Sequence, residues 1–402
     1  MNIKKKLIDD YLAYISSFTI ILLFPGFALY NTLVAYGFIT PIFGGFFGLF
    51  SVIYLILVLP MLLRLPVFLD NKSLGYFIIL IFLYVYIFLF STTNYLLDSR
   101  AGIEDAYFQI IETMTLTLAI FFIGFFVDLN QKIYKILLYT ILVSAALLLF
   151  YFLKTGQVMF YAKSFADDNA TEYVSTYQGY ARSAIITSLI VLSMTNRLAR
   201  YLFIYMLSIF ILFILGARSE FVGLVLSGTL LLLLRFKINI IQFLKLLSFC
   251  VLGLIVLYFS YDSFSGGRGA QVFDLANDTS WEARKSLEQI GLNQIIQHPI
   301  LGYFGGHILE GGSRGSYIHN VLSVWAGFGL ISFILYVLLC FIPFFHCILI
   351  ALKDKQQTDK FYFCLSLSSV VVLLILFSKS FFWVLPGFVW GLYLSINRSR
   401  VK

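Results

Sequence analysis

Residues 200–235, RYLFIYMLSIFILFILGARSEFVGLVLSGTLLLLLR, hold the pattern that decides the fold: two apolar runs on either side of the polar turn 216–220. A helix needs about 20 apolar residues to cross a membrane, and only 34 residues lie between Arg200 and Arg235. Two spans use nearly all of these residues, so the turn cannot project far into water. We therefore expect a membrane hairpin whose Arg218 lies at the depth of the membrane edge and faces the helix bundle.

The same apolar character extends along the whole chain. Hydrophobic residues make up 60% of the 402 residues and charged residues only 12%, which leaves too little polar surface for a water-exposed domain. The apolar runs are continuous and do not alternate with period two, which favours helices over a membrane β-barrel. We predict an all-α polytopic membrane protein, a single transmembrane domain over residues 1–402, with about twelve spans. The expected spans are 12–30, 37–60, 74–91, 106–127, 136–154, 177–195, 201–216, 221–235, 243–260, 320–342, 361–377 and 381–396.

Basic residues predict the orientation of these spans. An even number of spans puts both chain ends on one side, and 18 of the 28 Lys and Arg residues fall on that side, which the positive-inside rule assigns to the cytoplasm. Both termini are then cytoplasmic, and the long polar loop 261–319 is extracytoplasmic. The cytoplasmic loops are too short for a nucleotide-binding domain, and the sequence contains no GxxxxGK[ST] phosphate loop. This pattern also accounts for the net charge of +8 without nucleic acid, and it predicts a lipid-borne, extracytoplasmic or transported substrate.

Three cations are expected at the outer edge of the bundle. Arg218 has Glu220 nearby to offset its charge, Arg182 begins a span with Gln178 one helical turn earlier, and Lys379 lies in a tight link between the last two spans. Snorkelling at the interface is the alternative for all three cations. Ionisable residues within a membrane are functional candidates, and an arginine fork suits phosphate oxygens. The cations therefore predict an anion site, for which a pyrophosphate on a lipid carrier is the obvious ligand.

The loop 261–319 contributes a second set of candidates. Thr279-Ser280-Trp281-Glu282 is a capping box and predicts a short helix that ends near His298, before Pro299. The glycine-rich stretch that follows includes Gly302 and the segment around Arg314; it predicts either close approach to a ligand or a flexible linker. His319 and Asn320 open the next span, where a histidine can accept a proton from a hydroxyl. The histidine spacing matches no metal-ligand motif.

The order of these residues resembles the O-antigen polymerase and O-antigen ligase superfamily. The matching positions are Arg218, then Arg284 with Pro299 and Gly302, then His319 and Asn320 before Gly327 and Gly329; they lie within residues 201–345. The resemblance implies a metal-independent, inverting glycosyltransferase of the GT-C type on the outer face of the bacterial inner membrane. It also implies that Arg218 and Arg284 bind the pyrophosphate of an undecaprenyl-linked glycan, that His319 orients or deprotonates the acceptor hydroxyl, and that a chain-length regulator is a partner. Arg314 has no clear counterpart in the family, and no cofactor is implied.

The residues and the resemblance together predict a polysaccharide repeat-unit polymerase that joins lipid-linked repeats. A ligase that transfers the glycan to lipid A–core shares the same motifs and stays open as an alternative. A lipid-linked oligosaccharide flippase is the alternative from another class. A transporter of that kind predicts two similar halves with charges at the midplane, whereas the charges here cluster at one edge.

Overall fold

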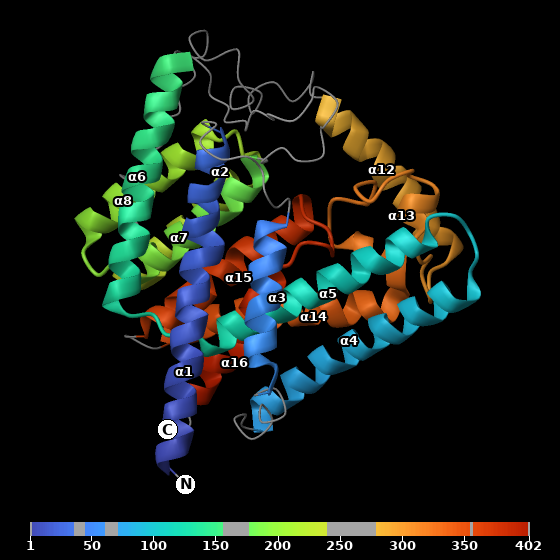
Figure 1. Ribbon diagram of the computed structural model, residues 1–402, viewed down its shortest axis with the longest axis horizontal. Helices are drawn as coiled ribbons and strands as arrows, with labels where there is room; N and C mark the ends of the chain where they lie inside the picture. The colour runs from blue at the N-terminus through green and yellow to red at the C-terminus, as the bar shows by residue number, and fades with distance from the viewer. Residues whose placement is uncertain are drawn as a thin grey trace.

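The computed structural model describes residues 2–35, 45–60, 71–155, 177–238, 279–353 and 357–400. All regular structure among these residues is helical, which confirms the all-α prediction for them (Figure 1). The helices are α1 (Asn2–Ile21), η1 (Leu22–Gly26), α2 (Phe27–Ala35), α3 (Phe46–Val58), α4 (Asn71–Leu97), α5 (Ile103–Phe126), α6 (Gln131–Thr155), α7 (Tyr177–Met194), α8 (Leu198–Ile214), α9 (Arg218–Phe236), α12 (Thr279–Gln297), α13 (Gly306–Leu309), α14 (Leu322–Lys353), α15 (Asp359–Phe377) and α16 (Leu385–Arg400).

Within the described ranges, seven helical segments are long and apolar enough to cross a membrane. They are Leu7–Leu33, Ser73–Leu97, Ile103–Phe126, Gln131–Phe150, Arg218–Phe236, Leu322–Lys353 and Asp359–Phe377. The chain is thus a membrane-embedded helical protein. The expected span 243–260 lies outside the described residues, and 37–60 is described only from residue 45 onward, where α3 forms.

The first long helical segment continues past a proline. Pro25 lies in the single π-turn η1 between α1 and α2. Proline lacks the N–H that would bond to the preceding turn and its ring crowds the carbonyl there, and a π-turn makes room for both effects. As a result Leu7–Leu33 continues as one segment.

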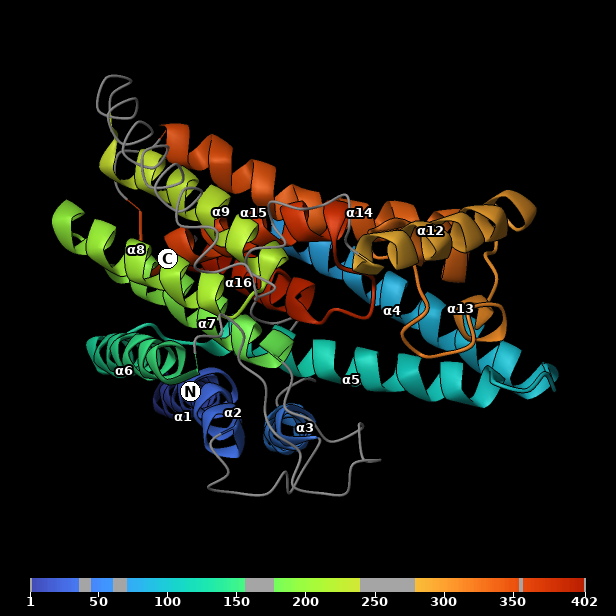
Figure 2. The ribbon, with the colours of Figure 1, turned by 90° about the horizontal axis from the view of Figure 1, so that it is seen from above.

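The short helix predicted in the polar loop is confirmed. It is α12, which ends immediately before His298 and Pro299. In Figure 2, α12 lies alongside the first part of α14, and α4 runs between α5 and α14. We call the end of the bundle that carries residues 298–321 the loop end.

At the opposite end of the bundle, two cations connect the helix ends. Arg235 forms an ion pair with Asp359 (3.0 Å), lies over the ring of Tyr362 (4.5 Å) and donates to the carbonyl of Ser193. Lys360 donates to the carbonyl of Val127 and to the Ser395 hydroxyl, each at 2.7 Å. Because their donors are used within the protein, both cations hold helix ends together.

The centre of the bundle depends on the close approach of α5 and α16. A Cβ on Gly391 would overlap the carbonyl oxygen of Phe121, and one on Gly387 would lie 2.5 Å from the carbonyl oxygen of Thr117. Gly124 of α5 faces the backbone of Phe388 in the same way. Small residues allow membrane helices to pack backbone to backbone, so these glycines set the distance between the two helices.

We predict that Gly391→Ala destabilises the protein by about 1–3 kcal/mol, because the added methyl forces α5 and α16 apart. Gly48→Ala is the matched control, because nothing lies within 4 Å of its Cβ position on α3 and alanine favours a helix over glycine by up to about 1 kcal/mol. Thermal unfolding of both purified variants measures the difference. Equal melting temperatures for the two variants would contradict the packing argument.

Candidate functional site

The loop end contains a buried ion pair between two distant parts of the chain. Lys379 Nζ lies 2.6 Å from Glu220 Oε1, and the Ser219 hydroxyl donates to Glu220 Oε2 at 2.7 Å. Glu220 is buried in the first turn of α9, which follows a left-handed turn at Gly216 (φ +66°). A carboxylate is stabilised at a helix start by the helix dipole. The pair therefore fixes the α15–α16 link against the start of α9.

Arg182 lies next to this pair on the second turn of α7. Its guanidinium lies 5.3 Å from the centre of the Phe47 ring, and it interacts electrostatically with Glu220 and Tyr317. It forms no hydrogen bond or ion pair with any residue that the structure describes. An arginine carries five N–H donors, so Arg182 presents unused donors beside a single carboxylate. The sequence expectation that Arg182 lies within the bundle edge agrees with this position.

His319 lies between the cations of two further elements. Burial, followed by the positive charges of Arg284 on α12 and Lys379, lowers the pKa of its imidazole to about 4. The ring contacts Tyr317 at 5.1 Å between centroids, and neither nitrogen bonds to a described residue. His319 is therefore neutral at pH 7 and has a lone pair with which to accept a hydrogen bond.

Taken together, these side chains make the loop end electropositive. Arg182, Lys379 and Arg284 contribute three positive charges, and Glu220 contributes one negative charge. Arg218 begins α9, two residues before Glu220 and at the same turn. A partly buried surplus of positive charge beside the unused donors of Arg182 fits an anion, and phosphate oxygens match the planar fork of arginine.

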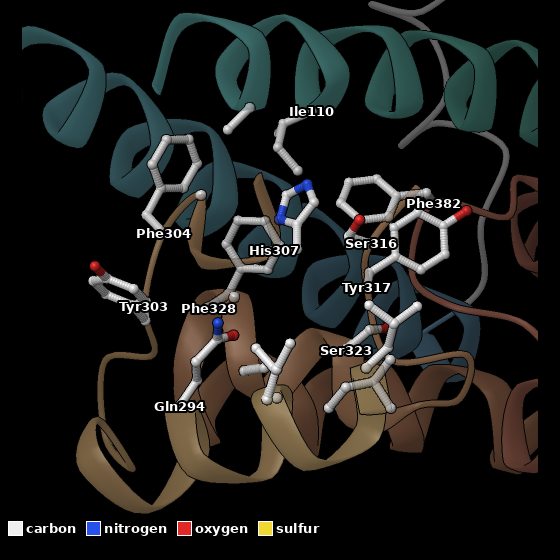
Figure 3. A pocket seen from close by; sticks show the side chains of 18 residues that line it. Ile110, Gln294, Tyr303, Phe304, His307, Ser316, Tyr317, Ser323, Phe328 and Phe382 are labelled. Atoms are coloured by element: carbon white, nitrogen blue, oxygen red, sulfur yellow. The ribbon is translucent and has the colours of Figure 1, made fainter. Parts of the chain in front are cut away.

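A small aromatic cavity adjoins this cluster on the side of α5, α12 and α14. Its volume is about 30 Å³, room for about one water molecule, and its lining includes Tyr317, His307 and Phe382 (Figure 3). His307 Nε2 lies 2.9 Å from Gln109 Oε1, and burial lowers the pKa of its imidazole to about 4. Tyr317 lines this cavity and also faces Arg182 and His319. Tyr317 therefore lies between the cavity and the side chains of Arg182 and His319.

Arg314 lies elsewhere at the loop end. It is exposed and pairs with Asp105 at 2.6 Å, in the first turn of α5. Its carbonyl accepts a hydrogen bond from Gln109 Nε2 at 2.9 Å. These contacts anchor the loop on α5, and the substrate-binding role of Arg314 stays a prediction.

The other predicted substrate ligands have local contacts of their own. Asn320 Oδ1 accepts from the backbone N–H of Leu322 at 2.9 Å and so caps the start of α14. Gly302 (φ +74°) packs directly on the backbone of Gly329, where a Cβ on either residue would overlap main-chain atoms. Gly302 therefore makes a close contact with the α14 backbone, and its contact with a substrate stays a prediction. Gln178 is exposed in the first turn of α7.

Sequence reasoning missed three residues of this region: Tyr317, Gln109 and Phe382. Tyr317 precedes His319 by two residues, so an extended segment places the two side chains on the same side, and this spacing was the available signal. No sequence signal pointed to Gln109 or Phe382, because each comes from a separate apolar helix or link. No cluster of three or more His, Cys, Asp or Glu side chains suited to a metal ion occurs within the described ranges.

The chain matches no protein-family model and no curated protein sequence.

We predict that Arg284→Gln raises the pKa of His319 from about 4 toward its ordinary value of 6.5, because one of the two repelling charges is removed. NMR titration of isotope-labelled histidine measures this shift. His307 is the internal control: its pKa is lowered by burial alone and should stay near 4. An unchanged His319 titration would show that Arg284 does not face the imidazole.

Proposed function

We propose that the chain is a polysaccharide repeat-unit polymerase that transfers a glycan from undecaprenyl pyrophosphate to the sugar of a second lipid-linked repeat. One observation carries the proposal: two cations, Arg284 of α12 and Lys379 of the α15–α16 link, act on one neutral histidine, and Arg182 of α7 lies by the carboxylate that pairs with Lys379. A group-transfer reaction with an anionic leaving group requires this combination of a positive pocket and an uncharged proton acceptor.

In the proposed reaction the acceptor hydroxyl attacks the anomeric carbon of the donor glycan. The new bond joins the acceptor oxygen to that carbon, and the bond from the carbon to the pyrophosphate oxygen breaks with inversion. Negative charge grows on the departing oxygen, where the donors of Arg182 and the charge of Lys379 would stabilise it. Arg218 and Arg284 supply the remaining positive charge around the pyrophosphate. No metal ion is required by this arrangement.

His319 would receive the proton of the acceptor hydroxyl. Its neutral imidazole can accept a hydrogen bond at pH 7, although a pKa of about 4 makes it a weak base. A bound pyrophosphate would offset the repulsion from Arg284 and Lys379 and so raise the pKa of His319. Binding of the glycan donor would thus make His319 a stronger base, and Tyr317 beside the imidazole ring would help to orient it.

The orientation in the membrane belongs to the same proposal. Twelve spans with both termini in the cytoplasm would place the loop end on the periplasmic face of a bacterial inner membrane, where lipid-linked repeats are joined in the O-antigen polymerase and ligase superfamily. The distribution of Lys and Arg supports this orientation. The order of Arg218, Arg284, Pro299, Gly302, His319 and Asn320 supports the family.

The orientation predicts the behaviour of reporter fusions. Alkaline phosphatase, which is active only in the periplasm, should be active when it is inserted at Gly312 in the exposed turn of the loop. The same enzyme fused after Lys402 should be inactive, and a fluorescent protein at that position should be bright. An active phosphatase at Lys402 would overturn the even number of spans.

The activity predicts a product ladder from purified protein in liposomes supplied with undecaprenyl-pyrophosphate-linked repeats. Arg182→Gln and His319→Ala should each lower the rate by roughly 10²–10³-fold, the cost of removing one transition-state donor or a general base. Arg200→Gln is the matched control, because it removes an exposed arginine at the opposite end and should leave the rate unchanged.

Added lipid A–core separates the polymerase from the ligase. Product found only on lipid A–core would replace the polymerase by the ligase. Full ladders from both Arg182→Gln and His319→Ala would contradict catalysis at this site. Transfer of intact repeats across the bilayer without any new glycosidic bond would instead identify a flippase.

A further inference from the structure

The C-terminal end of α12 and the turn after it carry an uncovered apolar surface. We call Leu292, Ile296, Ile300 and Leu301 the apolar corner; their exposed fractions are 39%, 75%, 66% and 58%. The exposed residues of the first half of α12 are mainly polar or charged: Glu282, Lys285, Ser286, Glu288 and Gln289. The second half exposes Leu292 and Ile296 beside Asn293 and Gln297, so, among the described residues, large apolar side chains are exposed on this helix only toward its C-terminal end.

The apolar corner is continuous with the exposed apolar stripe of α14. The backbone N–H of Leu330 donates to the carbonyl of Ile300 at 3.1 Å, so the corner lies level with Leu330. Below that level the exposed apolar residues of α14 continue as Leu330, Ile331, Ile334 and Leu338. Since α14 is one of the helices long and apolar enough to span a membrane, we expect this stripe to face lipid.

A tryptophan marks the same level. The indole N–H of Trp325 donates to the carbonyl of Pro299 at 2.8 Å, and its ring stacks on Phe333 at 4.9 Å. Tryptophan collects at the boundary between headgroups and hydrocarbon, where one part of the ring is apolar and the other polar. The turn that contains Pro299 and Ile300 is thus hydrogen-bonded to a residue type that is typical of the membrane interface.

Helix length gives the depth of the corner. From Leu330 to Lys353 the rise of 1.5 Å per residue amounts to about 35 Å. The hydrocarbon core is about 30 Å thick and the bilayer with its headgroups about 40–45 Å. If Lys353 lies at the opposite boundary, Leu330 and the apolar corner fall in the interfacial layer, a few ångströms from the hydrocarbon edge.

We propose that the apolar corner inserts into the interfacial layer of the same membrane leaflet and anchors α12 at the membrane surface. The occupant is the lipid bilayer, because the corner extends a lipid-facing stripe without a break. The polar first half of α12 would stay in water, so the helix would enter the membrane at one end only. This proposal concerns the membrane and does not depend on which reaction the loop end carries out.

Fluorescence quenching in liposomes tests the proposal. Ile300→Cys, labelled with an environment-sensitive fluorophore, should lose roughly half of its emission with lipids brominated near the headgroup, as expected for an interfacial segment. Iodide in the water should quench it weakly. Gln289→Cys, on the exposed side of the same helix, is the matched control and should show the reverse pattern.

Leu301→Cys provides a second probe in case Ile300→Cys folds poorly, and the unsubstituted protein measures background labelling of its buried cysteines. Quenching by iodide at positions 300 and 301 that equals the quenching at 289 would overturn the proposal. Protection of position 300 that appears only at high protein density would also overturn it, because a second copy of the chain would then cover the corner.

Discussion

Glu220 is a carboxylate buried near the start of a membrane-spanning helix, and such a charge persists only with a partner. Lys379 supplies the partner at 2.6 Å and Ser219 adds a hydrogen bond. Removing one member of a buried pair leaves an uncompensated charge that costs several kcal/mol, roughly 3–5. The arrangement of α9 against the α15–α16 link therefore depends on this pair. The pair also affects the net charge of the loop end. Among the described residues, Glu220 is the carboxylate that lies with the cations Arg182, Arg284 and Lys379, and it is already paired with Lys379.

Arg182 uses its donors differently from the other cations described above, since even at the loop end Lys379 and Arg314 pair with carboxylates. At the opposite end, Arg235 and Lys360 direct their donors at carbonyl oxygens, a carboxylate and a hydroxyl of the protein itself. At the loop end, Arg182 has a Phe47 ring beneath it but no hydrogen-bonding partner among the described residues. Cations that stabilise a fold are satisfied by that fold, whereas a binding site keeps donors in reserve for its ligand. The unused donors of Arg182 therefore support the proposal that the loop end binds an anion.

The fold was predictable from sequence to the extent that apolar run length and charge placement determine it. The ranges of the long helices follow from hydrocarbon thickness, and the helix after Thr279 follows from its capping box. Counting residues between charges also placed Arg182 and Arg218 near the loop end. These predictions succeed because each depends on neighbours along the chain.

The contacts between distant segments were not predictable in the same way. Nothing local in the sequence indicates that Glu220 pairs with Lys379, or that Gly302 packs on Gly329. The family resemblance predicted a site role for Asn320, but it did not indicate that the side-chain oxygen of this residue caps α14. In each case the partner comes from another helix or from the backbone of the next turn, and residue type alone does not distinguish these partners from a ligand.

The low pKa of His319 and the surplus of positive charge around it are one property with two consequences. The same charges that repel a proton from the imidazole attract an anion, so an occupied site and an empty site cannot have the same proton affinity. In the proposed reaction this coupling gives the base its strength only when the donor pyrophosphate is in place. A hydroxyl that enters an empty site would meet a weak base, and the coupling thus favours an order in which the donor binds before the acceptor loses its proton.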